Sequence, residues 1–114
     1  MLIRYKKNLE KIAMGLLSFM PVEKKGVKIL QQTIHEYETN SNWHLFLWKE
    51  AEDVLGIIGI RIEEENKLVI QHISVNPSHR NMGIGKKMVN EIKSQYEKEY
   101  TIVATDETKE FYQK

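Results

Sequence analysis

Two glycines and an arginine within six residues are the first candidate for chemistry in this sequence. Arg80, Gly83 and Gly85 lie between an apolar, β-branched run at residues 68–75 and a stretch with apolar residues at helical spacing. The first N–H groups of a helix lack intrahelical partners and carry the positive end of the helix dipole, so they suit a phosphate. Glycine lets a ligand approach the backbone closely, and arginine adds a permanent positive charge. The stretch therefore predicts an anion-binding loop at a strand-to-helix junction.

Other phosphate-binding loops fit this stretch less well. A dinucleotide fingerprint needs three glycines that open a βαβ unit and an acidic residue about 20 residues further on, but only Gly83 and Gly85 are present. A nucleoside triphosphate loop needs Gly-Lys followed by Ser or Thr, whereas Lys87 follows Lys86 here. A glycine-containing helix start that binds nothing is the remaining alternative.

The rest of the chain predicts the elements that would position this loop. The expected strands are residues 2–6, 43–49, 54–63, 68–75 and 100–105. The expected helices begin after Asn8, which we expect to cap the first helix, after Gly26, at Ile84 and at Glu107. Two apolar stripes are predicted to face the core: Leu9, Ile12, Ala13, Leu16, Leu17 and Met20 in the first helix, and Val27, Leu30, Ile34 and Tyr37 in the second. Gly56 and Gly59 indicate a bulge or a close backbone approach in the third strand.

The pattern Arg80-x-x-Gly83-x-Gly85, after a strand and the Val75-x-Pro77 turn, resembles the pyrophosphate loop of the GNAT superfamily of N-acetyltransferases. The order β-α-α-β-β-β-α-β-α is also that of the GNAT fold, so the resemblance covers nearly the whole chain. It implies one α/β (α+β) domain over residues 1–114, with a mixed, mostly antiparallel sheet flanked by helices. It also implies acetyl-coenzyme A as the acetyl donor and an amine, on a small molecule or a peptide, as the acceptor.

The resemblance further implies which residues hold the donor. Strand backbone at Ile73, Ser74 and Val75 would pair with the pantetheine, and an N–H there would polarise the thioester carbonyl. The loop N–H groups would bind the pyrophosphate. The loop residues concerned are Arg80, Asn81, Met82, Gly83, Ile84, Gly85 and Lys86.

Tyr112 and His72 are the candidate catalytic residues. In GNAT enzymes a tyrosine on the last helix protonates the leaving thiolate, and Tyr112 matches that position; a packing role beside Phe111 is the alternative. A glutamate on the fourth strand often serves as base, but the strand at residues 68–75 has no carboxylate. His72 has a suitable intrinsic pKa, yet alternation puts it on the face of Leu68 and Ile70, where a structural histidine is equally expected. Glu63 and Glu64 are alternative bases.

The sequence departs from the family at its end. GNAT domains usually continue after the tyrosine-bearing helix with a glycine-aromatic pair and one or two strands, whereas this sequence stops at Lys114. Three explanations are open: the chain is cut short, the last element is minimal, or a second subunit supplies it, as in a homodimer.

Composition excludes several classes of function. The 114 residues include 17 basic and 16 acidic side chains, a formal charge of +1, which argues against a general nucleic-acid binder. Cysteine is absent, so no disulfide or thiolate metal site is expected, and the four histidines fall on four predicted elements without metal-ligand spacing. No apolar run reaches membrane-spanning length and no signal peptide is evident, so we expect a cytoplasmic protein without membrane contact.

Three functions therefore compete. The first is an N-acetyltransferase, similar in size and sequence to the acetyltransferase-like RibT proteins of riboflavin operons, which would imply a link to riboflavin biosynthesis. The second is a coenzyme A-binding regulatory or structural module without transferase activity. The third is a nucleotide-binding protein that uses the same glycine loop.

Overall fold

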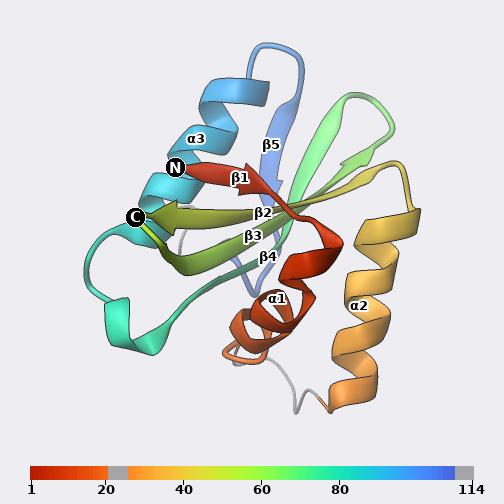
Figure 1. Ribbon diagram of the computed structural model, residues 1–114. Helices are drawn as coiled ribbons and strands as arrows, with labels where there is room; N and C mark the ends of the chain where they lie inside the picture. Colours follow the sequence, from red (N-terminus) through yellow and green to blue (C-terminus); the bar gives the residue numbers. More distant parts are fainter. Residues whose placement is uncertain (21–25, 110–114) are drawn as a thin grey trace.

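A five-stranded sheet with helices on both faces forms the fold (Figure 1). The computed structural model describes residues 1–20 and 26–109. The elements are β1 (Leu2–Arg4), α1 (Glu10–Leu17), α2 (Val27–Thr39), β2 (Trp43–Glu50), β3 (Asp53–Glu63), β4 (Lys67–Val75), α3 (Ile84–Tyr96) and β5 (Thr101–Ala104), with 3-10 turns at Lys7–Leu9 and Pro77–His79. The predicted order of these elements is confirmed. Most of the helix expected from Glu107, including Tyr112, lies outside the described residues.

The strands lie side by side in the order of the chain, β1-β2-β3-β4-β5. Neighbours from β1 to β4 are antiparallel, since short turns join β2 to β3 and β3 to β4, whereas β5 is parallel to β4. A parallel neighbour requires a crossover, and α3 supplies it. The sheet is therefore mixed and mostly antiparallel, as predicted.

Each face of the sheet carries its own apolar core. Helix α3 packs on one face of the sheet through its apolar residues, and α1 and α2 pack on the other face. The core under α3 includes Phe46, Ile58, Ile60, Leu68, Ile70, Ile73, Val75, Ile84, Met88 and Ile92. The core under α1 and α2 includes Ala13, Leu16, Leu17, Leu30, Ile34, Tyr37, Leu45, Leu47 and Ile57.

Strand β4 contains one more residue than the stretch of β3 it pairs with. Gly59 pairs with His72 and the next residue, Ile60, pairs with Ile70, so Gln71 is an extra residue in β4. This bulge lies in β4, opposite Gly59. The bulge expected in the third strand lies beside Gly56, since Trp48 pairs with Gly56 and Lys49 with Val54, which leaves Leu55 as an extra residue of β3. Because a bulge shifts the alternation by one residue, Ile73 and Val75 join Leu68 and Ile70 on the α3 face. The expectation that His72 shares that face is wrong: its side chain meets Tyr37 of α2 on the opposite face.

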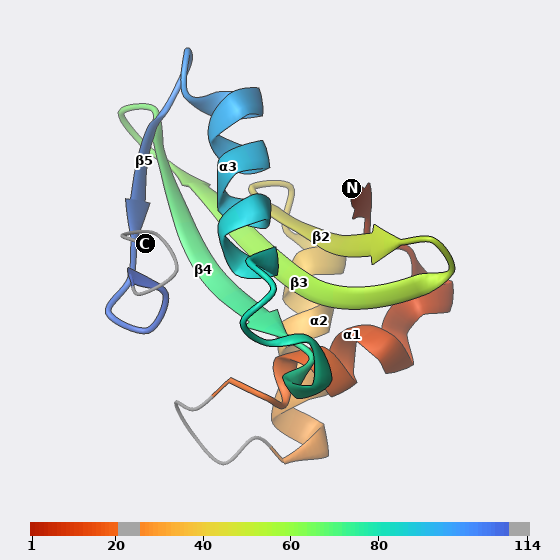
Figure 2. The same cartoon turned by 90° about the vertical axis from the view of Figure 1, so that its left-hand side faces the viewer.

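Beyond the bulge, β4 and β5 separate (Figure 2). Their pairing runs only from Lys67–Thr101 to Ile70–Ala104 among the described residues. A bulged strand bends and twists more strongly, so the second half of β4 turns away from its neighbour. As a result, residues 73–75 have an edge that β5 does not cover.

Three expectations for α1 and α2 are wrong. Asn8 does not cap α1: it lies inside the 3-10 turn, and the residue before the helix is Leu9, without a side-chain cap. Ile12 is 44% exposed and Val27 is 65% exposed, whereas the other residues of both predicted stripes are buried or half-buried. Each exception lies within the first three residues of its helix.

The space above Gly59 is filled by a side chain from α2. A Cβ atom added to Gly59 would overlap the hydroxyl and ring of Tyr37. Tyr37 is itself buried, 7% exposed, with its hydroxyl bonded to His72, so it has no free space to move into. Gly59 therefore lets α2 approach the bulge closely.

We expect Gly59→Ala to lower the free energy of unfolding by about 1–3 kcal/mol, because the added methyl group overpacks a rigid site. Gly15→Ala is the matched control. Gly15 lies inside α1 with nothing within 4 Å of the added Cβ, so alanine there should raise the free energy of unfolding by about 0.5–1 kcal/mol. Urea denaturation followed by circular dichroism measures both. Equal effects of the two substitutions would show that the contact between Gly59 and Tyr37 does not constrain the fold.

Candidate functional site

The glycine loop adopts the left-handed backbone that its sequence suggests. Gly83, the residue before α3, has φ +74° and ψ +15°, and Asn81 has φ +69°. Glycine and asparagine adopt this region more readily than other residues. The first backbone bond of α3 runs from Lys87 N–H to Gly83 O at 3.0 Å. The N–H groups of Ile84, Gly85 and Lys86 thus have no partner within the helix and form the positive end of its dipole.

The turn before the loop is fixed by Asn76. Its side-chain Oδ1 accepts from Ser78 N–H at 2.9 Å, and its carbonyl accepts from His79 N–H at 2.8 Å. Pro77 begins the 3-10 turn, where its missing N–H and fixed φ do no harm. This turn delivers Arg80 and the loop to the start of α3.

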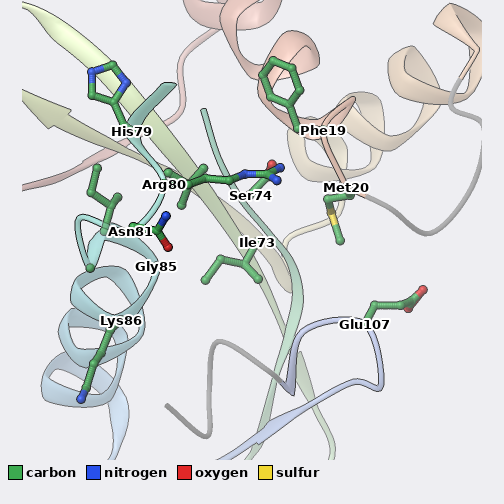
Figure 3. A pocket seen from close by; sticks show the side chains of 13 residues that line it. Phe19, Met20, Ile73, Ser74, His79, Arg80, Asn81, Gly85, Lys86 and Glu107 are labelled. Carbon is green, nitrogen blue, oxygen red and sulfur yellow. The ribbon is translucent and has the colours of Figure 1, made fainter. Parts of the chain in front are cut away.

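A cavity of about 520 Å³ lies between this loop and the free edge of β4 (Figure 3). Of the residues predicted to bind the cofactor, all but Met82 line it; Met82 is 54% exposed and lies outside the lining. The predicted residues in the lining are Ile73, Ser74, Val75, Arg80, Asn81, Gly83, Ile84, Gly85 and Lys86. The structure thus brings the two predicted segments together at one hollow.

The edge of β4 offers backbone groups to this cavity. Asn76 N–H donates to Leu55 O of β3 at 2.8 Å. Because alternate residues of an antiparallel strand direct their backbone groups to opposite sides, those of Ile73 and Val75 point away from β3. They point to the side that β5 leaves uncovered. An extended ligand could pair with them as an added strand does.

Two basic side chains of the loop, Arg80 and Lys86, line the cavity. His79 also lines it, and its Nδ1 is the buried side-chain polar atom without a partner in residues 1–20 and 26–109. Lys87 instead lies 3.9 Å from Glu50. The Trp48 indole N–H, 2.8 Å from the Glu50 carboxylate, is the main reason that the pKa of Glu50 is lowered, and Lys87 adds to this.

His72 is held by Tyr37, outside the lining of this cavity. The Tyr37 hydroxyl lies 2.6 Å from His72 Nδ1. Burial raises the pKa of Tyr37, so the hydroxyl stays protonated at neutral pH. Among the described residues, the hydrogen-bond partner of the Tyr37 hydroxyl is His72 Nδ1. A buried hydroxyl hydrogen needs an acceptor, so the hydroxyl donates to Nδ1. Neutral His72 then has its hydrogen on Nε2.

The two alternative bases lie elsewhere. Glu63 forms an ion pair with Arg61, and Arg61 Nε donates to Gln71 Oε1, the extra residue of the bulge, at 2.8 Å. Glu63 and Glu64 line a separate hollow beside Asn42. Tyr112 lies outside the described residues.

Besides His79, three residues that the sequence analysis did not assign to the site complete the cavity: Phe19 and Met20 just after α1, and Glu107 after β5. Their distance in sequence from the loop gave no signal, since only the folded sheet brings them together. In the described part of the chain, no group of three or more His, Asp or Glu side chains could hold a metal ion. None of the described helices is both long and apolar enough to span a membrane.

Comparisons with known proteins agree with this architecture. The model of the family described as the acetyltransferase (GNAT) family matches residues 13–114. A Bacillus methanolicus protein, described as an uncharacterized N-acetyltransferase in the lysA 3′ region, is 60% identical over 96 residues, which cover 84% of this chain and 79% of that protein.

Solved structures of low sequence identity share the fold. The aminoglycoside 6′-N-acetyltransferase AAC(6′)-Ig from Acinetobacter haemolyticus has a TM-score of 0.76 at 16% identity, covering 93% of this chain and 78% of that one. AAC(6′)-Iy, solved with a bisubstrate analogue containing coenzyme A, has a TM-score of 0.76 at 13% identity, covering 92% and 78%. The predicted fold is therefore confirmed.

We expect NMR of the His72 ring to show a protonated Nε2 and an unprotonated, hydrogen-bonded Nδ1 above the pKa of this histidine. Nitrogen chemical shifts distinguish the two ring nitrogens. Tyr37→Phe should release Nδ1 and mix the two tautomers, whereas Tyr5→Phe, which removes another bonded hydroxyl near α2, should leave the His72 signals unchanged. A protonated Nδ1 in the parent would show that Tyr37 accepts from His72 rather than donating to it.

Proposed function

Since this chain belongs to the GNAT acetyltransferase family, as its match over residues 13–114 shows, we propose that it transfers the acetyl group of acetyl-coenzyme A to an amine. The observation that carries the proposal is one cavity that joins a left-handed, glycine-opened helix start to an uncovered strand edge. A phosphate-bearing end and an extended, amide-containing arm are the two parts of coenzyme A that such a cavity suits.

The loop fits the pyrophosphate. Backbone N–H groups from Gly83 to Lys86 would donate to its oxygens, and Arg80 supplies a permanent charge beside them. A Cβ on Gly83 would meet nothing within 4 Å, so glycine is favoured there by its φ rather than by crowding. Asn81 and Ile84 complete the loop. Met82 would contribute only its backbone to binding of the pyrophosphate, because its side chain lies outside the cavity lining.

The edge of β4 fits the pantetheine arm. Backbone groups of Ile73 and Val75 would pair with its amides, and the buried Ser74 between them keeps the strand extended. An N–H at this edge would also donate to the thioester oxygen as charge develops on it, which is oxyanion-type stabilisation.

The reaction requires one proton acceptor and one proton donor. The amine nitrogen forms a bond to the acetyl carbon as the carbon–sulfur bond breaks; the ammonium form loses two protons in all, the thiolate takes up one, and one is released. We propose Tyr112 as the donor to the thiolate, on the GNAT pattern. We propose His72 as the acceptor; since Tyr37 favours hydrogen on Nε2, the tautomer must first exchange, with the Tyr37 hydroxyl turning to accept.

A coenzyme A-binding module without transferase activity is the second candidate. The absence of a carboxylate from β4, where many GNAT enzymes have their base, favours it. Acetyl transfer or hydrolysis by the pure protein, lost on substitution of Tyr112, would exclude it. Calorimetric competition between ADP and coenzyme A distinguishes both candidates from the third function, a nucleotide-binding protein that uses the same glycine loop.

The acceptor's place in metabolism is still a prediction. The Bacillus methanolicus relative is described by the lysA 3′ region and not by riboflavin, so the proposed link to riboflavin rests on the sequence resemblance alone. Cytoplasmic location and a homodimer are also predictions; gel filtration with light scattering tests the latter.

We expect isothermal titration to show binding of acetyl-coenzyme A and coenzyme A to the parent protein, and a loss of at least about tenfold in affinity in Gly83→Val, because a β-branched residue disfavours the left-handed φ. Gly83→Asn is the matched control, since asparagine tolerates this φ and should stay within a few-fold of the parent. Circular dichroism confirms folding of each variant. Parent protein that binds neither ligand would overturn the proposed function.

We expect Tyr112→Phe and His72→Gln to lower kcat by about 10²–10⁴-fold each, while the dissociation constant of acetyl-coenzyme A stays unchanged, because proton transfer contributes to the chemical step alone. Tyr100→Phe and His35→Gln control for loss of the same groups elsewhere: Tyr100 stacks edge-on against Tyr96, and His35 is exposed on α2. Single-turnover kinetics over pH measure the effect. A pH–rate profile unchanged in His72→Gln would remove His72 as the base.

A further inference from the structure

We propose that the end of the cavity opposite the glycine loop binds the acceptor as a cationic primary amine with an apolar body, and that Glu107 accepts hydrogen bonds from its ammonium group. This inference rests on the proposed function and names the substrate class that the same cavity would take. The residues that carry it are Glu107, Phe19 and Met20.

The lining residues differ in charge. Arg80 and Lys86 of the loop are basic, whereas Glu107 is the one carboxylate among the described lining residues. In the close-up, Glu107 and Met20 lie on one side of Ile73 and Asn81 and Lys86 lie on the other, while the Arg80 side chain extends from the loop toward Ser74 (Figure 3). A ligand anchored by an anion at the loop and by a cation at Glu107 would span the β4 edge between them.

Glu107 is held in place by its neighbour. Thr108 is fully buried, and its hydroxyl donates to Ile70 O at 2.9 Å and accepts from Thr105 N–H at 3.0 Å. Ile70 is the last residue of β4 that pairs with β5, so the turn carrying Glu107 is fastened where the two strands separate. The backbone of a fastened turn loses little conformational freedom when its carboxylate binds a cation, so the entropy cost is limited to the Glu107 side chain.

The adjacent carboxylate behaves differently. The Asp106 side chain is 99% exposed and lies 3.8 Å from Lys109, outside the cavity lining. Both acidic residues of this turn are exposed, but Glu107 lines the cavity and Asp106 does not. Asp106 therefore provides a control of equal charge in the same turn.

The wall beside Glu107 is apolar. Phe19 is 39% exposed and Met20 is 6% exposed, and both follow α1 in a turn closed by Phe19 N–H to Leu16 O and Met20 N–H to Leu17 O. An exposed phenyl ring next to a buried thioether offers contact to an alkyl or aromatic group. A monocationic arylalkylamine matches both features, whereas an amino acid would bring its own carboxylate next to Glu107, where like charges repel.

The ion pair between Glu107 and the ammonium group of the acceptor also affects turnover. The ammonium ion that binds Glu107 loses two of its three protons in the reaction and becomes a neutral amide, so the product lacks the charge that held the substrate. Glu107 thus favours the substrate over the product, and its contribution should be measured in KM for the amine rather than in the affinity for the donor.

The test uses 2-phenylethylamine and phenylalanine as acceptor probes with saturating acetyl-coenzyme A. Parent protein, Glu107→Gln and Asp106→Asn are compared by the release of free thiol. We expect 2-phenylethylamine to be the better acceptor, and Glu107→Gln to lower its kcat/KM by about 10- to 100-fold through KM, the value of a charge-assisted hydrogen bond. Asp106→Asn should match the parent. Acetyl-coenzyme A affinity by calorimetry should be the same in all three proteins.

Each other outcome contradicts the inference. Equal kcat/KM in Glu107→Gln and the parent, equal losses in both variants, or a preference for phenylalanine would overturn it and leave the proposed function intact. The inference would also be overturned, with the proposed function intact, if the parent protein bound acetyl-coenzyme A but neither acetylated 2-phenylethylamine nor bound it in calorimetry. A parent protein that fails to bind acetyl-coenzyme A would overturn the proposed function itself, and this inference with it.

Discussion

The extra residue in β4 is the constraint on which the rest of the structure depends. Opposite Gly59, β4 has both Gln71 and His72, and a strand with such an insertion bends away from its neighbour. Without the bend, β5 would continue along β4, and the backbone groups of Ile73 and Val75 would be used in the sheet. Because the strands separate, a hydrogen-bonding edge stays available inside a small domain, beside the start of α3.

Three contacts hold this irregular point, and they come from distant parts of the chain. Tyr37 of α2 fills the space above Gly59 and bonds His72, Arg61 of β3 bonds Gln71, and Thr108 satisfies the Ile70 carbonyl. Polar groups that a bulge removes from the strand ladder are expensive to bury without partners. The surrounding side chains therefore both stabilise the bulge and fix how far the strands open. The helices on the α1–α2 face are thus coupled to the shape of the cavity.

How much the sequence predicts depends on the range of the interactions involved. The glycine loop was predicted well because its signal is local: a strand, a proline turn, glycine at a left-handed position and an amphipathic helix follow one another within 30 residues or so. The side of the sheet on which His72 lies was predicted wrongly, because alternation assumes a regular strand. The bulge in β4 becomes visible only when β3 and β4 are paired. The exposure of Ile12 and Val27 depends on how each helix packs against the rest of the fold, which periodicity does not show. Phe19, Met20 and Glu107 were missed for the same reason, since no spacing in the sequence relates them to Gly83.

The two ends of the cavity suggest an order of events that follows from charge alone. If the amine binds as proposed, Arg80 and Lys86 would repel it in the cavity before the donor binds, and Glu107 would attract it. A bound pyrophosphate would neutralise the loop end and remove that repulsion. The donor's arm along β4 would also supply the wall that the amine needs beside Phe19 and Met20. Binding of the donor first is therefore the order that this distribution of charge favours, with the amine entering a cavity that the donor has completed.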